Sequence, residues 1–241
     1  MTIGRHLDWE GGFNIRDLGG IATNDGRKTR RSSVVRSGSL HHLTKPGWQA
    51  LATYGVRTII DLRNTNEREA ANYIAPNSEI TCIHLPLEEQ HEPSDAEFWK
   101  RWRGFNCSPL YYSAFLNQYP DRASAVIAHI ANARPGGVLF HCGIGRDRTG
   151  LIALLLLKIL GATHEEIVSD FLLSIERLRT HWARIGLRND EDDIAKLFER
   201  EKSSATSAII ATITDIDGVE RFRTNGIGDN DLDLLRTRFL E

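Results

Sequence analysis

Residues 136–150, GGVLFHCGIGRDRTG, decide the fold of this chain and lead into the apolar run LIALLLLKIL. The three apolar residues 138–140 follow a double glycine, which predicts a short buried strand that leaves a turn. The leucine-rich run predicts a helix. Residues 142–148 therefore form a loop that joins the end of a strand to the start of a helix.

The composition of this loop suits a bound phosphate group, and we call residues 142–148 the phosphate loop. A loop that ends at a helix N-terminus presents unpaired backbone N–H groups and the positive end of the helix dipole. Gly143 and Gly145 allow positive φ angles, so the backbone can close around an anion. Arg148 carries a planar guanidinium that binds two phosphate oxygens. The predicted phosphate-binding residues are Gly143, Ile144, Gly145, Arg146 and Thr149.

Cys142, at the start of the phosphate loop, is the candidate nucleophile. The field that attracts phosphate also stabilises a thiolate, and cysteines at helix N-termini beside cations have thiol pKa values of roughly 3.5–7.5. We therefore expect Cys142 to be ionised at neutral pH. Thr149 is placed to give its hydroxyl to the cysteine sulfur, and a ring N–H of His141 is placed to hold the loop. The alternative, an inert buried cysteine, fits the loop and Arg148 poorly.

His141-Cys142, followed by five residues and Arg148-Thr149, resembles the HCxxGxxR[ST] motif of cysteine-dependent protein tyrosine phosphatases. FNIRDLGG (13–20), RSGSL (36–40) and IIDLRNTNE (59–67) precede it in the order found in the bacterial and fungal tyrosine/serine and lipid-phosphatase branch. That branch carries NFRDLGG-, DLRxxxE- and HCxAGKDRTG-like motifs. The C-terminal tail is also similar, so the resemblance spans nearly the whole chain. It implies an α/β fold with a mostly parallel central sheet flanked by helices, and additional C-terminal helices.

The resemblance implies hydrolysis of phosphomonoesters through a phosphocysteine at Cys142, without a cofactor or a metal. The general acid is left open among three aspartates. The branch places it immediately before the loop arginine, which corresponds to Asp147. Asp95 lies in the polar segment 88–99, which has no WPD-like triplet, and Asp61 is a third candidate. We prefer Asp147 because it is fixed on the loop, although it needs a raised pKa beside a dianion.

Other charged residues of the matching blocks are expected to support the site. His141, Asp61 and Arg63 are the predicted supporting residues. For Arg36 and Arg63, two roles remain equally open: an ion pair with a carboxylate of the protein, or a contact with the substrate. Arg16 and Asp17 are expected to hold the turn of the first block.

Two loop residues depart from the branch pattern. Arg146 stands where the branch usually has lysine, and Ile144 replaces a smaller residue. Both arginine and lysine are cations, but they present their charge differently. These departures bear on the preference for lipid substrates more than on phosphatase activity.

The length, composition and net charge of the chain limit the type of protein that it can be. The chain has 241 residues, of which 41% are hydrophobic and 26% charged, typical of one globular domain. We divide it into a sheet and phosphate loop over about 1–160 and a helical extension over about 161–241. A net charge of −2 and a pI near 6.5 provide no basic field for nucleic acid or an anionic membrane.

The cysteines and the chain start indicate a compartment. Cys82, expected to be buried and inert, Cys107, expected to be a loop thiol, and Cys142 are odd in number and widely spaced. This argues against a disulfide framework or a zinc site and for a reducing environment. The first residues lack the apolar core of a signal peptide, and LIALLLLKIL is far shorter than the roughly 20 residues of a membrane span. We expect a cytoplasmic protein.

Strands alternating with helices are predicted along the chain. The predicted strands are 33–36, 56–62 and 80–87, in addition to the one before the phosphate loop. The predicted helices are one from the Thr44 N-cap to Gly55, one over 109–133 that is interrupted near Pro120, one that opens with the Thr163 and Glu166 capping box and passes Leu178, and a helical region over 190–218. The polar segment 88–99 is predicted to be turn-forming and is a candidate flap.

Three functions are compatible with these residues. The first is a phosphatase acting on phosphotyrosine in proteins and releasing inorganic phosphate. The resemblance also allows phosphoserine, phosphothreonine and phosphoinositide substrates. The second is a silent phosphate-recognition module, which would normally lack the cysteine or the arginine. The third is a thiol enzyme such as a rhodanese or an arsenate reductase; the latter needs a resolving cysteine, and neither Cys82 nor Cys107 is close in sequence. The oligomeric state is left open.

Overall fold

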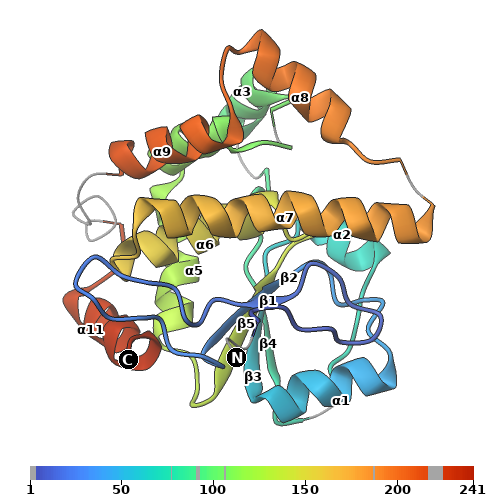
Figure 1. The fold of residues 1–241 in the computed structure, drawn as a ribbon, viewed down its shortest axis with the longest axis vertical. Helices are drawn as coiled ribbons and strands as arrows, with labels where there is room; N and C mark the ends of the chain where they lie inside the picture. Colours follow the sequence, from blue (N-terminus) through green and yellow to red (C-terminus); the bar gives the residue numbers. More distant parts are fainter. Residues whose placement is uncertain (1–3, 77, 91–92, 106, 187, 217–224) are drawn as a thin grey trace.

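A mostly parallel sheet forms the centre of the protein (Figure 1). The computed structural model describes residues 4–76, 78–90, 93–105, 107–186, 188–216 and 225–241. Within these residues the sheet has five strands in the order β1-β2-β5-β3-β4. The strands are β1 (Arg16–Asp17), β2 (Val34–Ser37), β3 (Val56–Asp61), β4 (Thr81–His84) and β5 (Gly137–His141). Only the pairing of β1 with β2 is antiparallel, which confirms the predicted α/β class.

Helices follow most strands and extend the chain beyond the sheet. They are α1 (Lys45–Tyr54), α2 (Thr65–Ala70), α3 (Pro93–Trp102), the short 3-10 helix η1 (Pro109–Tyr111), α4 (Tyr112–Gln118), α5 (Pro120–Ala131), α6 (Asp147–Ile159), α7 (His164–Ile185), α8 (Glu191–Arg200), α9 (Ala205–Asp215) and α11 (Asp229–Phe239).

The central strands β3 and β5 are buried on both faces because they carry apolar residues at successive positions. In β5, Val138 and Phe140 join one hydrophobic cluster while Leu139, between them, joins another. The second cluster includes Trp48 and Leu51 of α1, so α1 covers that face. The first cluster includes side chains of α5 and α6 and reaches α9 and α11. The central strands thus lie between two layers of helices.

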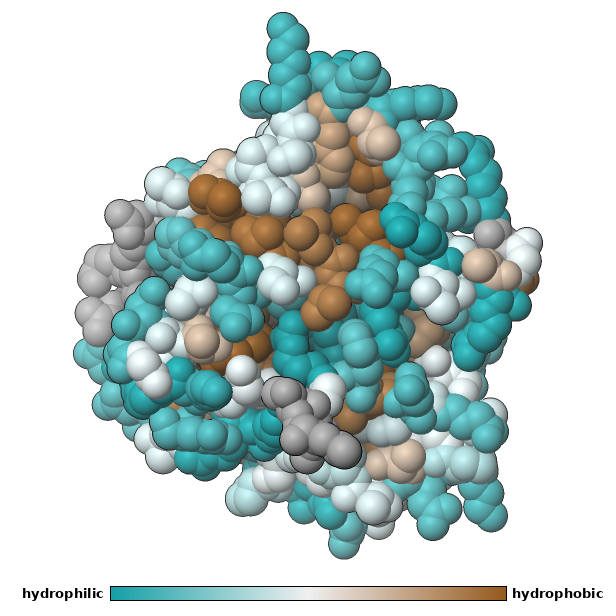
Figure 2. Space-filling model, viewed as in Figure 1, coloured by the Kyte–Doolittle hydropathy of each residue, from teal (hydrophilic) through white to brown (hydrophobic). Residues whose placement is uncertain are grey.

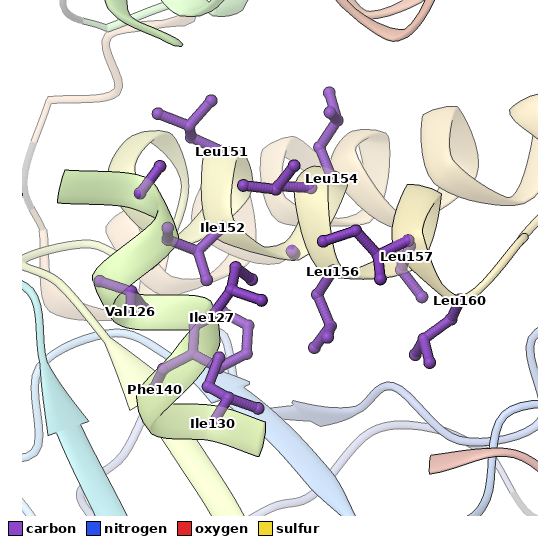
Figure 3. Packing of buried hydrophobic residues seen from close by; sticks show 14 of the residues in the cluster. Val126, Ile127, Ile130, Phe140, Leu151, Ile152, Leu154, Leu156, Leu157 and Leu160 are labelled. Carbon is purple, nitrogen blue, oxygen red and sulfur yellow. The ribbon is translucent and has the colours of Figure 1, made fainter. Parts of the chain in front are cut away.

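Helix α6 is the core helix of the larger layer. Eleven of its thirteen residues are buried, which follows from a run that is apolar on every side. Figure 3 shows Ile152 and Leu156 of α6 pointing toward Ile127 of α5 and Phe140 of β5. The helix that starts at the phosphate loop is therefore fixed by packing along its length.

Helix α7 lies between α6 and α9. Figure 2 shows apolar surface gathered between α7 and α9, where Leu172 and Ile210 remain partly exposed and line a cleft of about 440 Å³. Among the described residues, no helix combines the length and the apolar character needed to cross a membrane.

Local signals placed several helix ends correctly. The Thr44 hydroxyl accepts from the Gly47 N–H, and α1 ends at Gly55 in the left-handed conformation, as predicted. The Thr163 hydroxyl likewise accepts from the Glu166 N–H at the start of α7. The interruption near Pro120 separates α4 from α5. The predicted strands at 33–36 and 56–62 match β2 and β3 within one residue at each end.

Some predictions of local structure were wrong. The segment 88–99 is not turn-forming throughout, because α3 begins at Pro93; residues 91–92 lie outside the described part. Phe98, Trp99 and Trp102 pack against the core at helical spacing, and this outweighs the polar composition. The strand predicted at 80–87 shortens to β4. Cys82 is exposed rather than buried, because β4 is an edge strand.

Asp170 of α7 neutralises a group of arginines beneath the N-terminal segment. Its carboxylate pairs with Arg5 at 3.0 Å, with Arg16 of β1 at 2.9 Å and with Arg36 of β2 at 2.5 Å. Asp170, Arg16 and Arg36 are almost completely buried. Burial alone would raise the pKa of Asp170, but the arginines outweigh it and hold this pKa well below the ordinary value. Helix α7 is thereby joined to the edge of the sheet.

We predict that Asp170→Asn lowers the free energy of unfolding by about 3 kcal/mol at pH 7, because Arg16 and Arg36 would stay buried without a counter-charge. The folded-state pKa of Asp170 lies below its unfolded value, so the carboxylate stabilises the fold above about pH 4 and this contribution is lost as pH falls. Urea unfolding at several pH values should show the difference between the two proteins shrinking below about pH 4.

The control is Asp193→Asn, which breaks the exposed pair of Asp193 with Arg188 at 2.7 Å. This variant should lose less than about 1 kcal/mol. Equal losses for the two variants would show that Asp170 has no special role in stability.

Candidate active site

The phosphate loop joins the end of β5 to the start of α6, at the edge where parallel strands place ligands. Each loop carbonyl in the following set accepts a hydrogen bond from a group outside the loop. The bonds run from His141 Nδ1 to Cys142 O (3.1 Å), from Ser39 N to Gly143 O (2.9 Å), from Asn14 Nδ2 to Ile144 O and Gly145 O (both 3.0 Å), from Arg36 Nη2 to Gly145 O (2.8 Å) and from Tyr112 Oη to Asp147 O (2.7 Å).

These bonds fix the direction of the backbone amides. In a trans peptide the N–H points opposite to the C=O of the preceding residue. With the carbonyls held outward, the N–H groups of the phosphate loop turn toward its interior, beside the N-terminus of α6. The loop therefore has the geometry of an anion-binding site.

The two loop glycines differ in their backbone demands. Gly145 has φ +73°, and a Cβ there would lie 2.5 Å from the Gly38 nitrogen. Gly143 is not among the described residues with positive φ, contrary to our expectation, and a Cβ there would meet its nearest atoms at 3.6 Å and 3.7 Å. Only Gly145 is thus required by conformation and by close approach.

Cys142 and His141 lie at the base of the loop. Cys142 is 2% exposed, and His141 is completely buried. Burial lowers the pKa of His141 to about 4, so its ring is neutral near pH 7. The carbonyl of Cys142 can only accept, so Nδ1 of His141 carries the proton, and Nε2 accepts from the Tyr73 hydroxyl at 2.7 Å. A neutral histidine thus anchors the loop through its ring N–H.

Thr149 lies in the first turn of α6. Its hydroxyl oxygen is buried and has no hydrogen-bond partner within the described part of the chain, the Cys142 sulfur included. A buried hydroxyl without a partner costs free energy, so it is available to a group that enters the site or to a charged sulfur.

Arg148 is held by two carboxylates. Its Nη2 lies 2.7 Å from Oε1 of Glu67, and its Nη1 bonds the other oxygen of that carboxylate. Its Nε lies 3.5 Å from Oε2 of Glu88. Burial raises the pKa of Glu88, although Arg148 and the Tyr111 hydroxyl act in the opposite direction. We did not single out either glutamate from the sequence; the signal for Glu67 was its position at the end of IIDLRNTNE.

Asp147 and Arg146 stand together at the start of α6. Asp147 is 9% exposed, and burial raises its pKa above the ordinary value despite the nearby Arg146 and Arg148. The Arg146 guanidinium, 2% exposed, donates to Asp147 at 3.2 Å and to both oxygens of Asp190 at 3.0 Å and 2.8 Å. The side chain of Arg146 is therefore engaged by carboxylates, and its backbone remains in the loop.

Asp61 and Arg63 pair with each other. Arg63 donates to the two oxygens of Asp61 at 2.9 Å and 2.7 Å, and it also bonds Ser39 and the Ala71 carbonyl. Asp61 lies 3.8 Å from His141. Through Ser39 and His141, which both bond the phosphate loop, this pair supports the loop indirectly.

The other candidates lie in structural contacts. Asp95 is buried on α3 and pairs with Arg122 at 2.9 Å. Asp17 accepts from the Gly19 N–H at 2.7 Å and from the Ser32 N–H at 2.8 Å, which holds the turn as expected. Arg36 contacts Asp170 and the phosphate loop, which accords with the ion-pairing alternative.

A cavity of about 660 Å³ opens beside Gly143 and Ile144. Its wall includes Trp182 and the stacked rings of Phe13 and His181, whose centroids are 4.1 Å apart at an interplanar angle of 11°. Flat apolar walls of this kind suit an aromatic ring. No group of three or more potential metal-ligating side chains occurs in the segments that the structure describes.

We predict that Gly145→Ala lowers the free energy of unfolding by about 2 kcal/mol or more, because the added carbon meets backbone atoms at a positive φ. Gly143→Ala is the matched control in the same loop, and it should cost less than about 1 kcal/mol. Chemical unfolding of both variants measures the contrast. Equal stability of the two variants would contradict the assigned loop geometry.

Known proteins resemble this chain over much of its length. The model of a family described as the tyrosine phosphatase family matches residues 7–241. A Cupriavidus necator protein, provisionally named a tyrosine-protein phosphatase, is 32% identical over 181 residues, covering 72% of this chain and 65% of that protein. A tyrosine-protein phosphatase of Nostoc commune is 32% identical over 148 residues, covering 61% of this chain and 49% of that protein.

A third relative is named a triple specificity protein phosphatase, from Mycobacterium tuberculosis. It is 27% identical over 202 residues, covering 73% of this chain and 71% of that protein. The chain spans less than two thirds of the length of the first two relatives. The family match extends over the sheet, the phosphate loop and the C-terminal helices, so the resemblance found in the sequence is confirmed at the level of the family. This chain belongs to the tyrosine phosphatase family.

Proposed function

We propose that this protein hydrolyses phosphomonoesters through a phosphocysteine intermediate and that phosphotyrosine in proteins is its main substrate. The observation that carries this proposal is the set of outward hydrogen bonds on the loop carbonyls, which turns the amides toward the interior of the loop that begins at Cys142. Membership of the tyrosine phosphatase family and the names of the relatives support it.

In the proposed first step the Cys142 sulfur attacks phosphorus, so that the S–P bond forms as the bond to the leaving oxygen breaks. The loop amides and Arg148 stabilise the charge on the remaining phosphate oxygens. Asp147 gives its proton to the leaving oxygen. In the second step Asp147 takes a proton from water, which attacks phosphorus, releases the thiolate and yields inorganic phosphate.

The surroundings of each group support its role. The Thr149 hydroxyl has no partner among the described residues and can stabilise the sulfur when it leaves. Glu67 holds the Arg148 guanidinium in place. His141, Asp61 and Arg63 support the loop from below. Asp147 carries the raised pKa that a proton donor needs, whereas Asp95 is paired with Arg122.

The cavity beside the loop supports an aryl phosphate substrate, because its walls include the Phe13 and His181 ring pair. Arg146, the loop cation that bears on the preference for lipid substrates, donates its hydrogen bonds to Asp147 and Asp190. We therefore expect phosphoinositides to be poorer substrates than phosphotyrosine. A turnover screen should compare both with phosphoserine and phosphothreonine peptides.

The three cysteines are free thiols, which supports a reducing compartment such as the cytoplasm.

Cys142→Ser should lower turnover of p-nitrophenyl phosphate by about 10⁴-fold or more, because a hydroxyl is a far weaker nucleophile and leaving group at neutral pH than a thiolate. Binding of orthovanadate or phosphate, measured by calorimetry, should change by less than about tenfold, since the amides and Arg148 are retained. Undiminished turnover by the variant would exclude a covalent intermediate on Cys142.

Asp147→Asn should lower kcat/KM, which reports only the first step, by about 10²-fold or more on phosphotyrosine and phenyl phosphate, which have poor leaving groups. The loss on p-nitrophenyl phosphate should be much smaller. The donor must be protonated, so the rate on poor leaving groups falls as pH rises through the raised pKa of Asp147, and the variant should lack this limb.

The matched variant is Asp95→Asn, which should affect stability through the Arg122 pair but show no dependence on the leaving group. If the leaving-group dependence appeared in the Asp95 variant instead, Asp147 would not be the acid.

A further inference from the structure

Arg146 connects the phosphate loop to a residue that the reaction does not otherwise use. One guanidinium is shared between two carboxylates: Nε donates to Asp147, while Nη1 and Nη2 donate to the two oxygens of Asp190. The two bonds to Asp190, at 3.0 Å and 2.8 Å, are shorter than the bond to Asp147 at 3.2 Å, and a bidentate pair of this kind matches the planar fork of a guanidinium. Asp190 thus accepts two of the three side-chain hydrogen bonds that Arg146 donates within the described residues.

Asp190 does not perform the usual task of an aspartate at its position. It is the N-cap residue of α8, where an aspartate side chain normally accepts from the first backbone N–H groups of the helix. Its side chain makes no such cap bond. Both carboxylate oxygens go instead to Arg146. The geometry therefore directs Asp190 at the phosphate loop, 44 residues earlier in the chain, rather than at its own helix.

The charges around Asp147 give this arrangement an electrostatic effect. Three charged side chains act on Asp147. Arg146 and Arg148 belong to the phosphate loop and the start of α6, and Asp190 lies directly before α8. The other titratable groups that interact with it are Glu88 after β4, Cys107 before η1, Tyr111 of η1 and Tyr112 of α4. A carboxylate at Asp190 neutralises Arg146 and adds a negative charge nearby. Both effects favour the protonated form of Asp147.

We propose that Asp190 is a positioning residue that, by holding Arg146, favours the protonated form of Asp147, the form that gives its proton to the leaving group. This inference rests on the proposed role of Asp147 as the general acid. Without Asp190, Arg146 would be free to turn fully onto Asp147 and bind it as a carboxylate. Asp147 would then be a poor donor at neutral pH.

The test is Asp190→Asn, which keeps the size of the side chain and removes its charge. In the pH–rate profile, kcat on phenyl phosphate falls at high pH, and this basic limb should move to lower pH by about one unit in the variant. The reason is the loss of one negative charge close to Asp147. At pH 7.5 this lowers the rate on phenyl phosphate about tenfold, with a much smaller change on p-nitrophenyl phosphate. Carbon-13 NMR titration of the Asp147 carboxyl, which is independent of catalysis, should show the same downward shift.

Three further variants separate this role from a merely structural one. Asp190→Glu restores the charge and should return the limb toward the wild-type position. Arg146→Gln removes the cation and should move the Asp147 titration the opposite way, to higher pH. Glu191→Gln is the matched control: it removes one negative charge from the adjacent residue, which pairs with Arg179 at 2.9 Å, and should shift the limb by less than about 0.3 unit.

An Asp147 titration that is identical in wild type and Asp190→Asn overturns the inference, even if Asp147→Asn shows the leaving-group dependence expected of an acid. Equal shifts in Asp190→Asn and Glu191→Gln overturn it as well, because a carboxylate paired with Arg179 would then act as strongly as the one that holds Arg146. A carboxyl titration that moves while the rate profile does not would overturn the role of Asp147 as the donor, and with it the catalytic part of the inference.

Discussion

The outward hydrogen bonds of the phosphate-loop carbonyls are the constraint on which the site depends. A loop of this length has many conformations in the unfolded chain, and these hydrogen bonds select one in which its N–H groups turn toward its interior. The donors that select it come from distant segments: Asn14 and Arg36 from the N-terminal region, and Tyr112 from α4. Arg36 also pairs with buried Asp170, so α7, the sheet edge and the loop form one connected network. Binding an anion then requires little reorganisation of the backbone.

A second feature of the site is the compensation of its arginines by nearby carboxylates. A site rich in N–H groups and arginines concentrates positive charge, and carboxylates placed around it compensate for this charge. Glu67 holds Arg148, and Asp190 holds Arg146. Glu88 and Asp147, which are more deeply buried, have raised pKa values. The carboxyl groups thus divide into two whose pKa is lowered, Glu67 and Asp190, and two whose pKa is raised, Glu88 and Asp147, and the difference is set by burial and by which arginine each contacts.

Much of the fold could be predicted from the sequence because its signals are local. The apolar run of α6, the Thr44 and Thr163 caps and the strand before Cys142 depend on neighbouring residues alone. Predictions failed where packing or sheet position decides the outcome. Helix α3 forms because its aromatic residues reach the core, and Cys82 is exposed because its strand is at the edge.

The sequence by itself determined the family, the order of the main elements and the placement of Cys142, Asp147 and Arg148 on one short loop, since residues six or fewer apart are joined by the chain itself. Only the tertiary structure decided the partners of these residues. Glu67 and Asp190 reach the loop across long sequence separations, and no spacing rule connects them to it. Which guanidinium a carboxylate neutralises, and which carboxyl keeps its proton, depends on distance and burial, and both exist only once the helices have packed onto the sheet.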